Sequence, residues 1–212
     1  MKGGAIMINV LVACEESQRV CYAFRSRGFN AFSCDLQKCT GGLPCFHICD
    51  DVLPLIKSDH PIFFTQDGML HTVDHWDLLI AHPPCTYLSA VTAPLVYSSC
   101  GINEDRMEKL KQAADFFYEL YNCDIPHICI ENPRPLRIAK LPPVSQMIEP
   151  YFFGEPYSKR TYLWLKGLPP LFSTEIVEPK YSYTATVYGS KLRSKTFKGI
   201  ASAMADQWGD FL

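Results

Sequence analysis

The chain has 212 residues, of which 48% are hydrophobic and 20% are charged, with a formal net charge of −2. These values are typical of an ordinary soluble globular protein. The longest apolar runs, at 6–13 and 78–81, are too short to cross a bilayer, so no membrane association is expected. The start does not resemble a secretory signal, and we expect a cytoplasmic protein with reduced cysteines.

Charge is distributed unevenly along the chain. Residues 1–130 carry 9 Lys or Arg against 15 Asp or Glu, whereas residues 131–212 carry 11 against 7. This asymmetry indicates that the later segments face an anion. A solvated surface with random unevenness is the alternative.

Strand and helix signals alternate in the first part of the chain. Residues 6–13 form a continuous apolar run, typical of a strand buried on both faces. A helix is predicted over Glu15–Arg27, because Gly28 supplies a natural end. A second strand is predicted over Asn30–Cys34, directly before Asp35.

The later elements continue the alternation and then become less regular. In chain order they are a strand at 76–81, a helix capped by Asn103 that ends near Tyr121, strands at 127–130, 151–153 and 161–165, and a helix at 197–211. Repeated strand–helix–strand units predict an α/β fold, with a mainly parallel sheet and helices on both faces. We expect a single domain over residues 1–212.

Polar or reactive groups follow four of the predicted strands. They are Cys14-Glu15-Glu16, Asp35, Pro84-Cys85 and Glu131-Asn132. In parallel sheets the ligand sits at the carboxyl ends of the strands. The sequence therefore predicts an active site where these groups converge.

The acids near the first two strands favour a nucleoside-containing cofactor. Asp35 is placed to accept hydrogen bonds from ribose hydroxyls, and Asp51 could make a second adenosine contact. Either could instead be a loop acid or a helix cap. The turn 13–17 has no glycine and two carboxylates, which disfavours the pyrophosphate of NAD or FAD. A cationic cofactor such as S-adenosylmethionine suits it better.

Cys85 follows two prolines at a strand end, which holds its thiol in a loop. With a carboxyl group such as that of Glu131 nearby, the thiol has the partner needed to activate C5 of a pyrimidine. The thiolate adds to C6 while the carboxyl group engages N3 and the exocyclic amine. A buried inert thiol and a capping glutamate remain the alternatives.

The order of Asp35, Asp51, Pro84-Cys85, Glu131-Asn132-Pro133 and Lys159-Arg160-Thr161 resembles the cytosine-C5 DNA methyltransferase family, over roughly residues 6–165. The resemblance implies a Rossmann-like methyltransferase fold and a DNA substrate whose target base is flipped out of the stack. It implies Cys85 as the nucleophile, Glu131 as its carboxyl partner and Arg160 as a group that orients the base.

The resemblance also implies S-adenosylmethionine as the cofactor and the segment 86–101 as a mobile loop that closes over the base. With the strand-end argument it yields a set of predicted cofactor-binding residues: Cys14, Glu15, Glu16, Asp35, Asp51 and Pro83.

Three departures from the family pattern affect the prediction. The family's Phe-x-Gly-x-Gly motif is replaced by residues 13–17, and its last motif is only faintly similar to 196–201. A short segment, 166–195, stands where the family has a large target-recognition domain, as expected of a small, phage-like form. Its tyrosines and basic residues could follow a phosphate backbone, or it could simply cover the sheet. The tyrosines and basic residues of this segment are Tyr181, Tyr183, Tyr188, Lys180, Lys191, Arg193 and Lys195.

Other readings stay open. A free or single-stranded cytosine nucleotide could replace DNA as substrate, since it needs no recognition domain. His82-Pro83-Pro84 partly fits an amino-methyltransferase, and a catalytically inactive binding protein is a third hypothesis.

No metal is predicted, because the spacing of Cys34, Cys39, Cys45, His47 and Cys49 matches no CxxC pair, and His71 and His75 read as loop residues.

Overall fold

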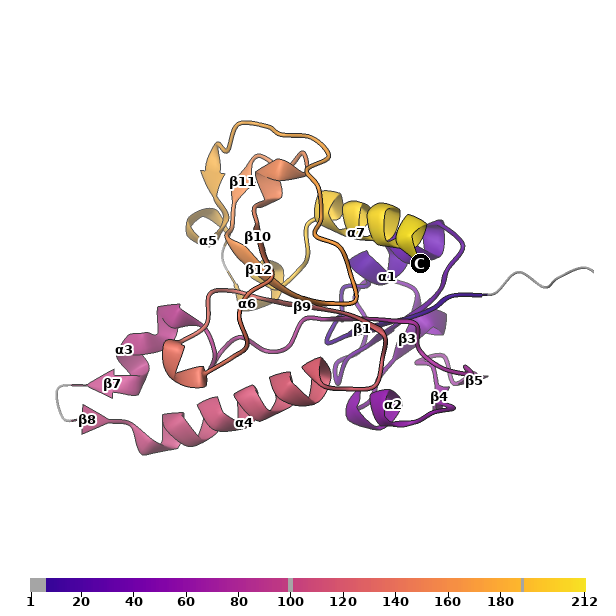
Figure 1. Ribbon diagram of the computed structural model, residues 1–212, viewed down its shortest axis with the longest axis horizontal. Coiled ribbons are helices and arrows are strands. Elements are labelled where there is room, and N and C mark those ends of the chain that lie inside the picture. The colour runs from indigo at the N-terminus through magenta and orange to yellow at the C-terminus, as the bar shows by residue number, and fades with distance from the viewer. Residues whose placement is uncertain (1–6, 99–100, 188) are drawn as a thin grey trace, which may run out of the picture.

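The computed structural model describes residues 7–98, 101–187 and 189–212 (Figure 1). The helices are α1 (Arg19–Ser26), α2 (Leu53–Lys57), α3 (Ala93–Val96), α4 (Glu104–Tyr121), α5 (Tyr183–Thr186), α6 (Ser190–Arg193) and α7 (Lys198–Phe211), with 3-10 turns η1 (Pro44–Phe46), η2 (Ala90–Thr92), η3 (Arg137–Ala139) and η4 (Pro150–Phe152). The strands are β1 (Asn9–Ala13), β2 (Asn30–Cys34), β3 (His47–Ile48), β4 (Ile62–Phe64), β5 (Leu70–Thr72), β6 (Leu78–Ala81), β7 (Tyr97–Ser98), β8 (Gly101–Ile102), β9 (His127–Asn132), β10 (Gln146–Ile148), β11 (Tyr157–Ser158), β12 (Thr161–Lys166) and β13 (Tyr181–Ser182).

A seven-stranded sheet in the order β10-β12-β9-β6-β1-β2-β3 forms the centre of the molecule. Its strands run parallel except β12, which pairs antiparallel with both β9 and β10. The sheet order reverses at β1, as it does in Rossmann-like folds. The predicted Rossmann-like, mainly parallel sheet is therefore confirmed.

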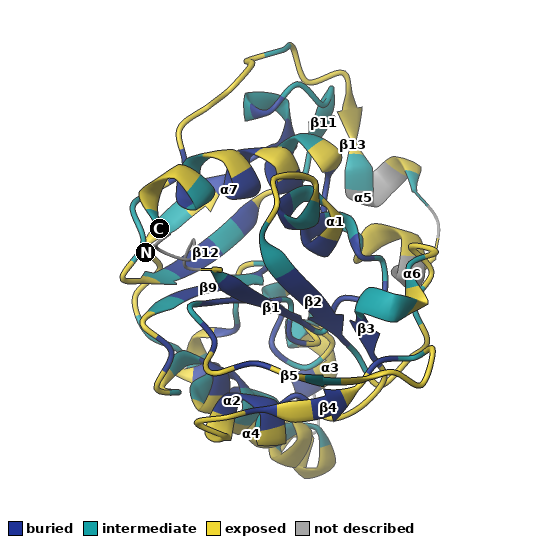
Figure 2. Ribbon diagram, turned by 90° about the vertical axis from the view of Figure 1, so that its right-hand side faces the viewer, coloured by how far each residue is buried: buried dark blue, intermediate teal, exposed yellow. Residues whose placement is uncertain are grey.

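Helices cover both faces of this sheet (Figures 1 and 2). The helices α1 and α7 lie on one face, where Phe24, Met204 and Trp208 are buried. The helices α2 and α4 lie on the other face, where Phe117 packs edge-on against Trp164 with ring centroids 5.1 Å apart. Strands β1 and β6 are buried along their whole length, which is why they read as continuous apolar runs.

The predicted helix at 103–121 is confirmed, including its cap. The side chain of Asn103 accepts a hydrogen bond from the backbone N–H of Arg106 at 3.1 Å. Glu104 and Asp105 lie in the first turn, where negative charge is favoured by the helix dipole. The final helix is confirmed as well, and its start at Lys198 places Thr196 directly before the helix.

Two predicted elements differ in the structure. The helix predicted from Glu15 begins only at Arg19, because Cys14 and Gln18 have left-handed φ values of 58° and 57° that interrupt a helix. The strand predicted at 151–153 is mostly the 3-10 turn η4, since Pro150 favours a helical first turn. The place beside β12 is taken instead by β10.

The segment 166–195 wraps over the β10–β12 edge of the sheet and the adjacent helix. Leu171 belongs to the core beneath α1 and α7, and Gln207 of α7 exchanges two hydrogen bonds with the backbone of Phe172. The strand β13 pairs with β11, so the segment is tied to the region just before β12. Tyr188 lies outside the described residues.

No helix in the described ranges is long and apolar enough to cross a membrane.

Candidate functional site

Four predicted site segments meet at the carboxyl ends of neighbouring strands. The turn after β1 carries Cys14–Gln18, and Asp35 follows β2. His82–Cys85 follows β6, and β9 ends with Glu131 and Asn132. Because β9, β6, β1 and β2 are adjacent in the sheet, these groups share one edge.

The turn after β1 is built around the buried carboxylate of Glu15. One of its oxygens accepts the backbone N–H of Val20 at 2.7 Å, and the other accepts that of Cys21 at 3.1 Å. Glu15 therefore caps the start of α1, at the position where a phosphate would bind in a dinucleotide fold. Burial raises the pKa of Glu15, against the lowering effect of His82 and the helix N–H groups. Its predicted contact with a cofactor stays a prediction, beside this structural task.

Glu16 lies beside Glu15 and connects the turn to the loop after β2. Its Oε2 accepts a hydrogen bond from the hydroxyl of Thr40, which also accepts one from Lys195 Nζ at 3.3 Å. The Oε1 atom of Glu16 is buried and has no hydrogen-bond partner within the described part of the chain. Gly41 allows this close packing, because a Cβ there would lie 2.6 Å from the carbonyl oxygen of Ser17.

Cys14, Asp35 and Asp51 gather at the ends of β1, β2 and β3. Burial raises the pKa of the Cys14 thiol to about 12, with Asp35 and Asp51 adding to the shift. Asp35 is half-buried and its Oδ1 accepts the backbone N–H of Gln37 at 2.8 Å, while the exposed Asp51 accepts that of Leu53 at 3.0 Å. Each carboxylate keeps an oxygen that can accept a further hydrogen bond.

These residues fit a cofactor with a positive charge and hydroxyl groups. The unpartnered oxygen of Glu16 can accept a hydrogen bond from an ammonium group, and Asp35 and Asp51 can accept bonds from ribose hydroxyls. A pyrophosphate does not fit, since Glu15 already occupies the start of α1.

His82 and Glu131 form a pair at the carboxyl ends of β6 and β9. His82 Nδ1 lies 2.9 Å from Glu131 Oε2, and the side chains are 10% and 13% exposed. Burial raises the pKa of Glu131, but the hydrogen bond from His82 and the charge of Lys159 outweigh it and lower this pKa. Burial lowers the pKa of His82, but Glu131 and Glu15 outweigh it, so this pKa is raised.

Cys85 is exposed by its accessible surface, yet the surrounding protein takes part of the water away from its sulfur. This desolvation and the negative charge of Glu131 raise the pKa of the thiol, while Lys159 and Arg193 act in the opposite direction. The thiol is therefore protonated at neutral pH in the free protein. A ligand that takes up or neutralises the charge of Glu131 would favour the thiolate.

Hydrogen bonds connect the loops that carry Cys85 and Glu131. Asn132 Nδ2 donates to the carbonyl oxygen of the buried Pro83 at 3.0 Å. The carbonyl of Cys85 accepts the backbone N–H groups of Leu88 and Ser89. The carbonyl of Pro83 thus joins the two loops, and its predicted contact with the cofactor stays a prediction.

Lys159 is a basic residue whose charge acts on this site and which was not among the predicted site residues. Its charge acts on Glu131, His82 and Cys85, and its Nζ donates to the carbonyl oxygen of Arg193 at 2.9 Å. The predicted Arg160 is 65% exposed and directs its Nε toward Glu149 Oε1, 3.6 Å away. The role of Arg160 in orienting a base stays a prediction.

Thr196 is a second site residue that the sequence analysis did not identify. Its hydroxyl hydrogen-bonds Glu131, and its carbonyl accepts a hydrogen bond from Arg19 Nη1 at 2.7 Å. The faint last motif at 196–201 contained the available signal, because Thr196 stands there directly before the final helix.

The segment 86–101 has structure of its own, with η2, α3 and β7, and residues 99–100 lie outside the described ranges. Arg106 of α4 ties its start down by donating to the carbonyl oxygen of Thr86 at 2.8 Å. The closing motion expected of this segment stays a prediction.

The residues considered for metal binding have other partners. Both ring nitrogens of His47 are engaged, with Ser33 Oγ at 2.9 Å and the carbonyl of Gln37 at 2.8 Å. His71 stacks on Phe63, while His75 lies 3.0 Å from Asp77 Oδ1.

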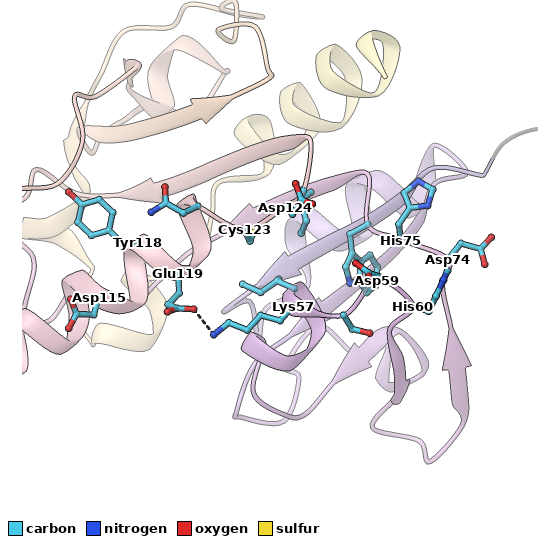
Figure 3. Close-up of a pocket in the computed structure, with 15 residues that line it drawn as sticks. Lys57, Asp59, His60, Asp74, His75, Asp115, Tyr118, Glu119, Cys123 and Asp124 are labelled. Carbon is cyan, nitrogen blue, oxygen red and sulfur yellow. Dashed lines mark ion pairs between the residues drawn. The ribbon is translucent and has the colours of Figure 1, made fainter.

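A surface hollow of about 950 Å³ lies at the opposite edge of the sheet (Figure 3). It is lined near the starts of β6 and β9 by residues such as His75 and Asp124, and an ion pair between Lys57 and Glu119 crosses it at 2.6 Å. Ligands of such sheets bind at the carboxyl ends of the strands, so we place the functional site there.

No family model matches this chain, and no curated protein matches it. Among solved structures it resembles the Entamoeba histolytica methyltransferase EhMeth, at 16% identity and a TM-score of 0.39, over 81% of this chain and 58% of that one. It also resembles the S. pombe Dnmt2 methyltransferase, at 13% identity and a TM-score of 0.37, over 86% of this chain and 56% of that one. The chain thus spans less than two thirds of either structure. Likeness this distant says nothing of activity, which has to follow from the chemistry of the site.

Proposed function

We propose that this protein transfers a methyl group from S-adenosylmethionine to C5 of cytosine in DNA. The observation that carries the proposal is the placement of Cys85 and Glu131. They lie at the carboxyl ends of adjacent parallel strands, close enough for the charge of Glu131 to raise the pKa of the thiol. A thiol and a carboxyl group so arranged match the two sides of a cytosine ring, with the thiol at C6 and the carboxyl at N3.

The proposed reaction uses the chain's residues in two roles. Cys85 attacks C6 as its thiolate, which shifts electron density toward C5 and N3. Glu131 binds N3 and the exocyclic amine, which orients the base and stabilises the charge that develops. Bound S-adenosylmethionine supplies the methyl group, with Glu16, Asp35 and Asp51 as the residues that would hold it.

Basic and aromatic residues beside the site support a polynucleotide substrate. Lys159, Arg193 and Lys195 lie near Cys85 and the turn after β1, and the rings of Tyr157 and Tyr183 pack tilted and edge-on against Phe197. Such a surface can follow a phosphate backbone and stack bases without reading a sequence.

A covalent trap tests the proposal. The protein is incubated with S-adenosylmethionine and duplex DNA that contains 5-fluorocytosine, and adducts are measured by mass spectrometry. We expect an adduct at Cys85 in the wild type and none in Cys85→Ser. The matched control Cys123→Ser changes a half-buried cysteine at the opposite edge of the sheet and should keep the adduct.

Labelled S-adenosylmethionine then identifies the substrate among duplex DNA, single-stranded DNA and dCMP. Label in the mononucleotide alone would contradict the DNA substrate. Label on the exocyclic amine, with Cys85→Ser fully active, would contradict C5 chemistry and favour amino-methylation through the His82-Pro83-Pro84 loop. Absence of label in all three would favour an inactive binding protein.

A further inference from the structure

His82 is a buried titratable group that the proposed reaction has not yet used. Its Nδ1 bonds Glu131 Oε2 at 2.9 Å, while its Nε2 is buried and has no hydrogen-bond partner among the residues that the structure describes. The backbone N–H of His82 donates to the carbonyl of Ala13 at 3.0 Å, which fixes the ring beside the end of β1. A ring held this firmly against a single carboxylate suits the storage or transfer of a proton.

Charged groups face His82 from three elements. Glu131 approaches from β9, Glu15 from the turn after β1, and Lys159 from the residues before β12. Two carboxylates against one ammonium group favour the imidazolium form of the ring, despite the cost of burying it. The same contacts favour the ionised form of Glu131, so the proton of the pair resides on His82.

This arrangement addresses a difficulty of the proposed reaction. When a thiolate adds to C6 of cytosine, negative charge develops at N3 and has to be neutralised by a proton. An isolated glutamic acid has a pKa of about 4.3 and carries no proton at neutral pH. Because the pKa of Glu131 is lowered further, this carboxyl group is even less able to hold a proton at neutral pH. A neighbouring group therefore has to supply the proton.

We propose that His82 stores, at Nδ1, the proton that Glu131 passes to N3 of the target cytosine. The inference rests on the proposed function and names the proton source of that site. His82 acts through Glu131 and does not touch the base, so it is a positioning residue that also holds the transferable proton.

The proposed step balances as follows. Cys85 first loses its Sγ proton to water. The Sγ–C6 bond then forms as the π electrons of C5=C6 move to C4–C5 and those of C4=N3 move to N3. The Nδ1–H bond of imidazolium breaks, an O–H bond forms on Glu131, and the carboxyl group gives a proton to N3. His82 ends neutral and Glu131 ends ionised, as it began. Bound S-adenosylmethionine would supply the methyl group that bonds to C5, its sulfonium becoming a thioether. The C5 proton is then released to water as the C6–Sγ bond breaks and Cys85 leaves as its thiolate, and N3 returns its proton through Glu131 to His82.

The charge state of His82 can be measured without any turnover. In protein labelled with ¹⁵N-histidine, the ring resonances of His82 are assigned by their loss in His82→Asn. We expect a doubly protonated ring at neutral pH in the wild type, and a midpoint moved to lower pH in Glu131→Gln. A neutral His82 ring at pH 7 in the wild type would overturn the proposal.

The delivery of the proton is tested with His82→Asn. Asparagine can still donate a hydrogen bond to Glu131 but has no proton to give. We expect its rate of adduct formation with 5-fluorocytosine DNA to be about a hundredfold below the wild type at neutral pH. The ratio of the variant rate to the wild-type rate should rise as the pH falls, because Glu131 then binds a proton from water. The control His75→Asn alters a histidine that is 64% exposed and pairs with Asp77 at the other edge of the sheet, and it should match the wild type.

The outcomes separate the two proposals. A wild type that forms adduct, with a His82→Asn deficit that is equal at every pH, means a purely structural histidine and overturns this inference alone. A wild type that forms no adduct, while His82 titrates as an imidazolium, overturns the proposed function and the delivery of a proton to cytosine with it.

Discussion

At the scale of single residues, neighbouring charges and burial set the protonation states of Cys85 and Glu131. Cys85 is kept protonated by burial and by the charge of Glu131, and Glu131 is kept ionised by His82 and Lys159. Any ligand that neutralises Glu131 removes a cause of the raised thiol pKa. In the proposed reaction, the reactivity of Cys85 would therefore depend on occupancy of the base site through electrostatics alone.

Alkylation of Cys85 by iodoacetamide should report this coupling. Because the thiolate is the reactive form, Glu131→Gln should lower the pKa of Cys85 and increase its alkylation rate severalfold at neutral pH. Lys159→Gln should have the opposite effect, since it removes a positive charge that favours the thiolate. Mass spectrometry follows Cys85, with the exposed Cys49 of the same sample as the reference. Equal rates in wild type and Glu131→Gln would contradict the coupling.

At the scale of elements, close backbone contacts hold α7 in place and with it the groups at the site. Gly199 packs against Phe153, and a Cβ at this position would lie 1.9 Å from the carbonyl oxygen of Phe153. Thr196, three residues earlier, reaches Glu131. A displaced α7 would thus disturb the carboxylate as well as the core.

Gly199→Ala should lower the free energy of unfolding by about 1–3 kcal/mol, because the backbone of Phe153 has to move to admit the methyl group. Urea denaturation measures the effect, and Ser202→Ala on the exposed side of α7 is the control. An unchanged free energy of unfolding in Gly199→Ala would show that Gly199 and the backbone of Phe153 are not in close contact.

At the scale of the whole molecule, acidic and basic residues of the site come from different parts of the chain. The acidic first part contains Glu16, Asp35 and Asp51, the proposed ligands of a cationic cofactor, and the basic second part contains Lys159 and Arg193 beside Cys85. A substrate with a phosphate backbone would meet the second group. The opposite edge of the sheet carries the hollow of Figure 3 and is rich in acids.

Binding of a short duplex should therefore weaken as salt increases. Replacing one backbone-contacting cation should reduce the slope of log affinity against log salt by about 1. We expect this for Arg193→Gln and for Lys180→Gln, both exposed on the segment 166–195. Fluorescence anisotropy measures the slope, and Lys57→Gln at the opposite edge should leave it unchanged. A slope unaffected in both test variants would place the phosphate contacts elsewhere.

Local patterns were sufficient to predict much of this fold. Continuous apolar runs predicted β1 and β6 because buried parallel strands have no polar face. Asn103 predicted the start of α4, because its side chain can cap a helix using only local backbone. The turn after β1 was predicted as helix, since nothing in its residue types announces left-handed backbone at Cys14 and Gln18.

The sequence by itself determined the class of sheet and the strand ends at which Cys85 and Glu131 stand, because both follow from short-range hydrophobic patterns and strand order. Only the tertiary structure decided which neighbours these groups meet. Glu15 turned inward to cap α1, the charge of Lys159 came to act on Glu131, and Thr196 and His82 reached Glu131. The last two contacts join residues 49 or more positions apart along the chain, and only the packing of distant segments sets their geometry.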